Sequence, residues 1–294
     1  MNSRRVHHPL TPLAFLAPAL LVLGTFSLAA MVQVAWYSLT KYTAFQGPVF
    51  VGLDNYRRLL ATDRFWLCLV NSAVYLLVTP VIIAVSLGAS IIVDARLKAT
   101  GWLRLVLFLP VVTPTIVAAM AFRLLFNEDA GLLNRGLMAL GVTDEPVRWL
   151  SQQPWTLMTA MLVTVWKGFG FYMMVFLSAL AAVPRELKEA AALDGAGRWR
   201  SFTSVTLPAI WPAVVLVFLV SSISALKVFD ELYVTIKGAP ITHQTVVPLI
   251  YQVAFEEGNY GMASAIGVAL FVAILAFSLV NLRLSQRREK GAKA

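Results

Sequence analysis

The amino-acid sequence predicts an all-α membrane protein with six transmembrane helices and with both termini in the cytoplasm. Of its 294 residues, 59% are hydrophobic and 13% are charged, whereas soluble proteins average about 45–50% apolar and about 25% charged residues. The apolar residues form long blocks that are separated by short charged segments. This apolar excess must face lipid, so we expect one transmembrane domain over residues 1–294 and exclude a water-soluble enzyme.

Six segments are long and apolar enough to cross a bilayer, which takes about 20 mainly apolar residues. They are residues 13–37, 66–93, 104–126, 155–180, 208–229 and 261–282. Arg4 and Arg5 precede the first segment, as basic residues do in a signal peptide. Because this apolar run is longer than that of a signal peptide and has no small-residue cleavage site, we expect a retained helix.

The distribution of basic residues sets the expected orientation of the spans. With the N-terminus inside, the cytoplasmic segments hold 14 Lys and Arg residues and the outer segments hold seven. This bias, with an even number of spans, places both termini in the cytoplasm. The formal net charge of +9 is therefore a topology signal, and no nucleic-acid partner is expected.

Helix-breaking residues interrupt three of the predicted spans. Pro80 lies in the second span, Pro110 and Pro114 in the third, and Gly168 and Gly170 in the fourth. Such residues are tolerated at membrane depth where neighbouring helices or a water-lined cavity satisfy the freed carbonyls. Two interpretations stay open: simple kinks that serve helix packing, or helices that line a translocation path.

The inner loop at about residues 181–207 is predicted to fold into two short helices. Pro184 suits a first helical turn and Gly195 or Gly197 suits a helix end, which predicts a helix over about 184–194. A second helix is expected to lead from there into the fifth span. Together they would form a rigid projection in the cytoplasm, joined directly to spans four and five.

This loop resembles the EAA motif of ABC-importer permeases. The match consists of Glu189-Ala190-Ala191, Asp194-Gly195-Ala196, Val205, Leu207-Pro208 and Pro212. Other segments resemble maltose-type carbohydrate permeases, namely Gly52-Leu53-Asp54-Asn55-Tyr56, Asn71-Ser72, Leu109-Pro110, Phe229-Asp230-x-x-Tyr233 and Tyr260-Gly261-x-Ala263-Ser264-Ala265. Residues 236–240 depart from the usual T-x-GGP of that family, which leaves the role of this outer loop open.

The resemblance implies the type I importer permease fold, with a coupling helix that docks in a cleft of a cytoplasmic ATPase subunit. The coupling residues it implies are Glu189, Ala190, Ala191, Leu193, Asp194, Gly195, Leu207 and Pro208. It also implies two ATPase subunits, a second homologous six-span permease and an extracytoplasmic solute-binding protein as partners. The expected location is the inner or plasma membrane of a bacterium or archaeon, as a multi-pass protein in the lipid bilayer.

The sequence carries no pattern for ATP hydrolysis or other catalysis. No G-x-x-x-x-G-K-[ST] segment occurs, so ATP and Mg²⁺ are expected on the partner ATPase and no cofactor is expected in this chain. His7, His8 and His243 do not cluster as metal ligands, and the single Cys68 suits a small apolar filler within a helix. We therefore expect no catalytic residue and no metal site.

Candidate residues for a substrate path lie at mid-depth on spans four and five. They are Thr164, Trp166, Lys167, Gly168, Phe171, Tyr172, Ser221 and Ser224. Polar groups at this depth are costly against lipid and are expected to face a cavity or a partner. Aromatic faces and hydroxyls suit a sugar, and the family resemblance places carbohydrate contacts at Trp166, Gly168, Phe171 and Ser221. The alternative is that these aromatic residues and serines only pack against neighbouring helices.

Lys167 has three open interpretations. It is a hydrogen-bond donor or anion attractor in the path, the partner of an acid on the second permease, or a side chain that snorkels to the interface. Asp230 and Glu231 lie too near the outer end of the fifth span to be assigned to it. For Arg123 and Lys227, near outer helix ends, snorkelling is expected.

The leading hypothesis is a permease subunit of an ATP-driven carbohydrate importer. Import of glycerol phosphate or of another polar solute is the alternative within the same class. A membrane-embedded enzyme is disfavoured because the acidic residues fall in loops or at span ends. An autonomous channel is disfavoured because the coupling loop would have no purpose without an ATPase.

Overall fold

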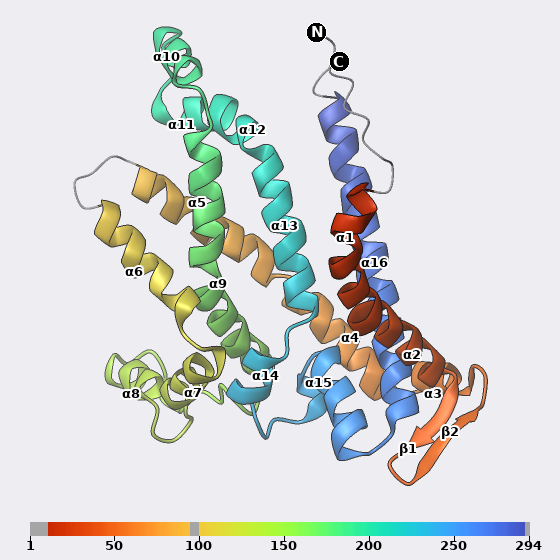
Figure 1. Cartoon of the computed structure of the whole chain (residues 1–294). Helices are drawn as coiled ribbons and strands as arrows, with labels where there is room; N and C mark the ends of the chain where they lie inside the picture. Colours follow the sequence, from red (N-terminus) through yellow and green to blue (C-terminus); the bar gives the residue numbers. More distant parts are fainter. Residues whose placement is uncertain (1–10, 95–99, 292–294) are drawn as a thin grey trace, which may run out of the picture. The chain divides into compact units, whose positions relative to one another are not determined.

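The computed structural model describes residues 11–94 and 100–291 (Figure 1). Expectations that concern Arg4, Arg5, His7, His8, Arg96, Lys98 and Lys293 lie outside these described residues. The chain divides into two units. The first runs to Thr62 and resumes at Ile250–Val272, and the second comprises Asp63–Leu249 and the chain from Ala273 onward.

The first unit joins an apolar helix to a small β-hairpin. Its elements are α1 (Thr11–Leu23), the π-helical η1 (Gly24–Leu28), α2 (Ala29–Ser38), β1 (Thr40–Thr43), β2 (Gln46–Phe50), α3 (Asp54–Leu60), η4 (Gln252–Glu256), the last residues of α15 (Val246–Tyr251) and the beginning of α16 (Tyr260–Gly291). The stretch Phe15–Ser38 is long and apolar enough to span a membrane. Its large side chains are mostly exposed, as those of a lipid-facing helix are.

The antiparallel β-hairpin is not among the predicted elements. Thr40 pairs with Phe50 and Lys41 with Val49. The amide of Asn55 donates to the carbonyls of Ser38 (2.9 Å) and Thr40 (2.8 Å). Asn55 belongs to a segment that resembles carbohydrate permeases, and its local role is to hold the hairpin at the end of α2.

The start of α16 packs closely on this hairpin. The Tyr260 and Tyr42 rings lie 5.0 Å apart, and the Ala44 N–H donates to the Gly258 carbonyl at 2.8 Å. A Cβ atom on Gly261 would overlap the Thr40 carbonyl oxygen. Glycine at 261 therefore allows two backbones to approach each other. This explains the glycine in the segment at residues 260–265, which resembles carbohydrate permeases.

The second unit is built around the long helix α9. Its elements are α4 (Asp63–Tyr75), α5 (Val78–Asp94), α6 (Thr100–Val112), α7 (Thr115–Leu125), α8 (Leu132–Ala139), α9 (Trp155–Ala181), α10 (Arg185–Leu193), α11 (Arg198–Ser201), the π-helical η2 (Phe202–Thr206), α12 (Leu207–Ala209), α13 (Trp211–Leu226), α14 (Asp230–Thr235), the 3₁₀ turn η3 (Ile241–His243), the first residues of α15 and the remainder of α16. α10 and α11 lie beyond one end of α9 and α13, and α7, α8 and α14 gather at the other end (Figure 1).

The helices of this unit are joined by apolar packing and by small polar contacts. α9 packs against α5, α6, α13 and α14, with Tyr75, Ile82, Phe176, Val217 and Leu232 in the shared core. The Ser86 hydroxyl donates to the Phe169 carbonyl at 2.9 Å. Small hydroxyl residues at helix contacts are typical of membrane bundles, since lipid offers no hydrogen bonds.

Four helical stretches in the described residues are long and apolar enough to span a membrane without a break. They are Phe15–Ser38, Asp63–Asp94, Trp155–Ala181 and Tyr260–Arg283. Two further pairs of helices are sharply bent, and counting each pair as one span gives six. This count agrees with the six predicted segments, although two of those segments are not the straight helices that were expected.

The predicted third span, residues 104–126, is broken. α6 and α7 meet at an angle of 93°, because Pro114 disfavours helical geometry at Thr113 and offers no N–H. The predicted fifth span, 208–229, begins only at Trp211 and ends at Leu226. The preceding helical stretch Arg198–Ala209 joins it at 67°, and Pro212 lies in the first turn of α13, where the missing N–H does no harm.

The two glycines expected to break the fourth span do not interrupt it, since α9 is continuous from Trp155 to Ala181. A Cβ on Gly170 would lie 2.5 Å from the Leu107 carbonyl oxygen and 2.9 Å from Val111 Cγ2. Gly170 is thus a contact point where α6 approaches α9. At Gly168 an added Cβ would meet only Ile82 Cδ1 at 3.5 Å and Tyr172 Cε2 at 3.7 Å.

We predict that Gly170→Ala destabilises the protein whereas Gly168→Ala does not. The added methyl at 170 must push α6 away, and overpacking of this kind costs about 1–3 kcal/mol. Thermal unfolding of the purified protein in detergent measures the difference. Equal melting temperatures for the two variants would contradict the close approach of α6 to α9.

Candidate functional site

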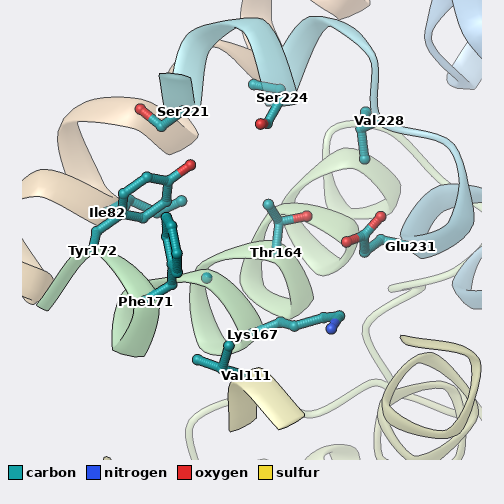
Figure 2. A pocket seen from close by; sticks show the side chains of 12 residues that line it. Ile82, Val111, Thr164, Lys167, Phe171, Tyr172, Ser221, Ser224, Val228 and Glu231 are labelled. Carbon is teal, nitrogen blue, oxygen red and sulfur yellow. The ribbon is translucent and has the colours of Figure 1, made fainter. Parts of the chain in front are cut away.

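A cavity of about 250 Å³ opens among the helices of the second unit (Figure 2). Its walls come from α5, α6, α9, α13 and α14. The lining residues are Ile82, Val111, Thr164, Lys167, Gly168, Phe171, Tyr172, Ser221, Ser224, Ala225, Val228 and Glu231. Five of these twelve residues belong to α9 and three to α13, the two helices that were predicted to carry the substrate path.

Seven of the eight residues predicted for the substrate path line this cavity. They are Thr164, Lys167, Gly168, Phe171, Tyr172, Ser221 and Ser224. The eighth, Trp166, is oriented differently: its ring packs against Phe122 of α7, with 5.4 Å between the ring centroids. Trp166 therefore faces α7 and is not among the residues that line the cavity.

The hydroxyl groups of the cavity are partly engaged within the helices. Thr164 Oγ1 donates to the Ala160 carbonyl at 3.2 Å and lies 2.7 Å from the buried Tyr75 hydroxyl, which therefore donates to it. Ser221 Oγ donates to the Val217 carbonyl at 2.7 Å. Because a hydroxyl has one donor and two acceptor positions, Ser221 keeps acceptor capacity toward the cavity.

Lys167 points toward the break between α6 and α7. Its ammonium donates to the main-chain carbonyl of Thr113, with 3.2 Å between Nζ and the oxygen. Thr113 is the point at which the 93° bend begins. The lysine thus supplies a donor to a carbonyl at a helix break, and at membrane depth such carbonyls need a partner.

Glu231 was not assigned to the site from the sequence, yet its side chain lines the same cavity. Figure 2 shows it at the same end of the cavity as Lys167. Burial and, to a smaller extent, the neighbouring Asp230 carboxylate raise the pKa of the Glu231 carboxyl above its ordinary value, while its own backbone N–H and the Lys167 ammonium act in the opposite direction. The signal was present in the segment Phe229-Asp230-x-x-Tyr233, but only the turn after α13 brings residue 231 back over the cavity.

Arg123 has a definite partner instead of snorkelling to an interface. Its guanidinium donates to the carbonyls of Lys237 (3.1 Å) and Val234 (3.4 Å), at the end of α14. Positive groups at a helix C-terminus are favourable because they meet unpaired carbonyls. Arg123 thereby attaches α7 to α14, the element that carries Glu231. Lys227 lies exposed at the end of α13.

The loop at residues 241–246, which follows the segment that departs from the T-x-GGP pattern, is held by α4. The Asn71 amide donates to the carbonyls of Thr242 (2.8 Å) and Gln244 (2.9 Å). Ser72 Oγ accepts from the Val246 N–H at 3.0 Å. The buried Cys68 donates to the Ile241 carbonyl at 3.3 Å, so the cysteine is a small buried group, as expected, and also a donor. One face of α4 therefore positions the whole loop.

The predicted coupling helix is present as α10, Arg185–Leu193. It ends in a Schellman motif: the Gly195 N–H donates to the Ala192 carbonyl (3.0 Å) and the Ala196 N–H to the Ala191 carbonyl (2.9 Å). Gly195 has φ of +75°, a left-handed conformation that strongly favours glycine at this position. The D-G-A part of the EAA pattern is thus the stop signal of α10.

The predicted coupling segment consists of α10, α11, η2 and α12, from Arg185 to Ala209. Most of the residues predicted for coupling are exposed. Glu189, Ala190, Asp194, Gly195 and Pro208 are exposed, as is Leu193 with 90% of its surface. Ala191 and Leu207 are half-buried. Leu193 is therefore almost entirely available for contact from outside the described residues.

Very short connections join the coupling segment to α9 and α13. Three residues separate α9 from α10, and Ile210 alone separates α12 from α13. Leu180, Val183 and Ile210 form a buried cluster at this junction, and Leu207 packs against it. α10 and α11 are therefore connected directly to the two helices that supply most of the cavity wall.

Residues 81–290 match the protein family described as the binding-protein-dependent transport system inner membrane component. The chain belongs to this family. Members are transport components of the inner membrane, which agrees with the several apolar membrane-length helices of the structure. The chain is accordingly a multi-pass membrane transport subunit.

Relatives match nearly the full length of the chain. It is 34% identical over 275 residues to the trehalose/maltose transport system permease protein MalF of Thermococcus litoralis, covering 92% of both proteins. It is 34% identical over 280 residues to the arabinooligosaccharides transport system permease protein AraP of Bacillus subtilis, covering 93% of this chain and 88% of that protein.

Solved structures show the same fold. A bacterial ABC transporter involved in the import of the acidic polysaccharide alginate contains a chain that matches with a TM-score of 0.82 at 21% identity, covering 94% of this chain and 95% of that chain. The fold of this chain is therefore that of an ABC importer permease.

We predict that Asn71→Ala destabilises the protein by about 1–3 kcal/mol, because two partly buried carbonyls lose their donor. Asn281→Ala is the matched control, since the Asn281 amide donates to the Phe277 carbonyl of its own helix. Chemical denaturation in detergent, compared between the two variants, measures the effect. Similar stabilities would show that the loop at residues 241–246 does not depend on α4.

Proposed function

We propose that this chain is the permease subunit of an ATP-driven importer that moves a carbohydrate across the membrane. The observation that carries the proposal is the direct connection between the exposed α10–α11 segment and the two helices that line the cavity. The similarity to permeases named for trehalose/maltose and arabinooligosaccharides supports a carbohydrate as the solute.

The cavity has suitable chemistry for a sugar. Phe171 and Tyr172 provide aromatic faces, and Ser221 and Ser224 provide hydroxyl groups. Sugars present apolar C–H faces together with hydroxyls that both donate and accept hydrogen bonds. A pocket that is mainly apolar with a few placed polar groups orients such a ligand.

The proposed assembly contains this chain, a second homologous six-span permease and two ATPase subunits. An extracytoplasmic binding protein delivers the solute, as in the alginate ABC transporter that was solved in complex with its oligosaccharide-bound periplasmic protein. ATP and Mg²⁺ are held by the ATPase subunits. This chain contributes the path and the coupling surface and performs no chemical step itself.

In the proposed mechanism, closure of the ATPase dimer around ATP draws the two coupling segments together. The junction of Leu180, Val183, Leu207 and Ile210 passes this movement to α9 and α13. These helices then rock and open the path outward, and the binding protein releases its solute there. Hydrolysis of ATP reverses the movement.

This mechanism requires α10 in the cytoplasm, and therefore N- and C-termini in the cytoplasm when six spans are counted. The basic residues around α10 and α11, Arg185, Lys188, Arg198 and Arg200, agree with that side of the membrane. The single-domain organisation over residues 1–294 is part of the same proposal.

The function is tested by co-purification of the chain with its partners, followed by ATPase measurements in lipid. The binding protein is saturated in turn with maltose, maltotriose, arabinotriose or glycerol 3-phosphate and is then added to the complex. Stimulation by one of the sugars, with uptake into vesicles, supports the carbohydrate importer. Stimulation by glycerol 3-phosphate alone would replace the carbohydrate, and absence of an ATPase from the purified protein would contradict the mechanism.

We predict that Gly195→Ala uncouples ATP hydrolysis from uptake whereas Gly197→Ala does not. Both glycines are exposed, but only Gly195 has a left-handed backbone, which costs other residues about 1–2 kcal/mol. The strain shifts the end of α10 and the neighbouring Leu193. Uptake and ATPase activity of the assembled complex are measured together, with Glu189→Ala as a second variant in the coupling segment. Wild-type coupling in both Gly195→Ala and Glu189→Ala would remove α10 from this role.

A further inference from the structure

The cavity brings two opposite charges together. Of its twelve lining residues, Lys167 and Glu231 are the two with charged side chains. One comes from the middle of α9 and the other from the first turn of α14. The formal charge of the lining is thus zero, although each residue alone would give the cavity a strong preference for ions of one sign.

The lysine is held at a fixed position. One of its N–H groups donates to the Thr113 carbonyl at 3.2 Å. An ammonium carries three donors, so further N–H groups remain for the cavity and for the Glu231 side of it. The break at Thr113 and Pro114 therefore fixes where this positive charge lies.

The glutamate is held in place by the element that carries it. α14 is attached to α7 through the Arg123 guanidinium, and Leu232, the residue after Glu231, is buried in the core of the unit. Asp230, the preceding residue, is exposed and is not among the residues that line the cavity. The charge that faces the cavity is therefore specific to position 231.

We infer that Lys167 and Glu231 form a charge-balanced pair that makes this cavity select uncharged carbohydrates over anionic ones, with Glu231 as the specificity-determining residue. This inference rests on the proposed function, since it assumes that the cavity belongs to the sugar path. It also disfavours anionic solutes such as glycerol phosphate, which the presence of Lys167 had left open as an alternative.

The physical reason lies in the balance of donors, acceptors and charge. A sugar hydroxyl can donate to the Glu231 carboxylate and accept from the Lys167 ammonium, so an uncharged sugar satisfies both groups. An anion gains from the lysine but meets the carboxylate within the same confined volume. It must also lose its water, and this loss is poorly compensated because repulsion by the Glu231 carboxylate offsets the attraction of the Lys167 ammonium. Rejection by a repulsive group is a common basis of specificity.

The test uses the assembled importer in lipid nanodiscs without its binding protein, so that the permease site alone selects the solute. Equilibrium dialysis measures the affinities for maltotriose, an uncharged trisaccharide, and trigalacturonate, an anionic one. The quantity compared is the ratio of the two affinities. The variants are Glu231→Gln, Lys167→Gln, the double variant and Asp230→Asn as the matched control.

We expect the wild type and Asp230→Asn to prefer maltotriose. Glu231→Gln is expected to shift the affinity ratio toward trigalacturonate by about tenfold or more, since the lysine loses its compensating charge. The double variant is expected to recover most of the wild-type ratio. Glu231→Asp, which keeps the charge, is expected to keep the preference. Lys167→Gln, which leaves the carboxylate without its compensating charge, is expected to strengthen the preference for maltotriose, and it tests the same point if Glu231→Gln does not assemble.

Two results would overturn the inference while leaving the carbohydrate importer intact. One is an affinity ratio for Glu231→Gln equal to that of Asp230→Asn, in a wild type that binds maltotriose. The other is a wild type that prefers trigalacturonate. If the wild type binds neither probe and no sugar in the uptake panel is transported, the proposed function itself fails, and the inference fails with it.

Discussion

The carbonyl of Thr113 lies where a membrane helix stops, and a membrane provides no water to satisfy it. The structure solves this problem with Lys167, whose ammonium donates to that carbonyl from the neighbouring helix α9. The position of the charged groups at the cavity depends on this arrangement. Because the break turns α7 through 93°, Arg123 meets the end of α14, and α14 in turn places Glu231 on the cavity.

The same constraint applies to small polar side chains at the helix contacts of this unit. Ser86 bonds to the backbone of α9, and Ser221 bonds within its own helix. Gly170 allows α6 to touch α9 directly. In lipid, helices are not pressed together by a hydrophobic effect, so close backbone contact and internal hydrogen bonds supply the association energy. A rigid bundle of this kind can move as a body when its end is displaced.

That end is the α10–α11 segment. α10 ends at the left-handed Gly195, with two hydrogen bonds back to its last turn. A small apolar cluster around Ile210 attaches the segment to the bundle. The exposed Leu193 has no packing role within the chain's described residues. The segment therefore combines a fixed shape, an unburied apolar contact and a short connection, which are the properties that a mechanical coupling surface needs.

The sequence by itself determined the membrane class and the position of α10, because these follow from local composition, proline and glycine signals and a long motif. It also pointed to seven residues that share one cavity, since helical spacing places them on one face of α9 and of α13. Only the tertiary structure decided that Trp166 faces α7 and that Glu231 lines the same cavity as Lys167. Both results depend on where the chain turns after Thr113 and after Leu226, and the direction of such a turn is set by contacts between residues far apart in the sequence.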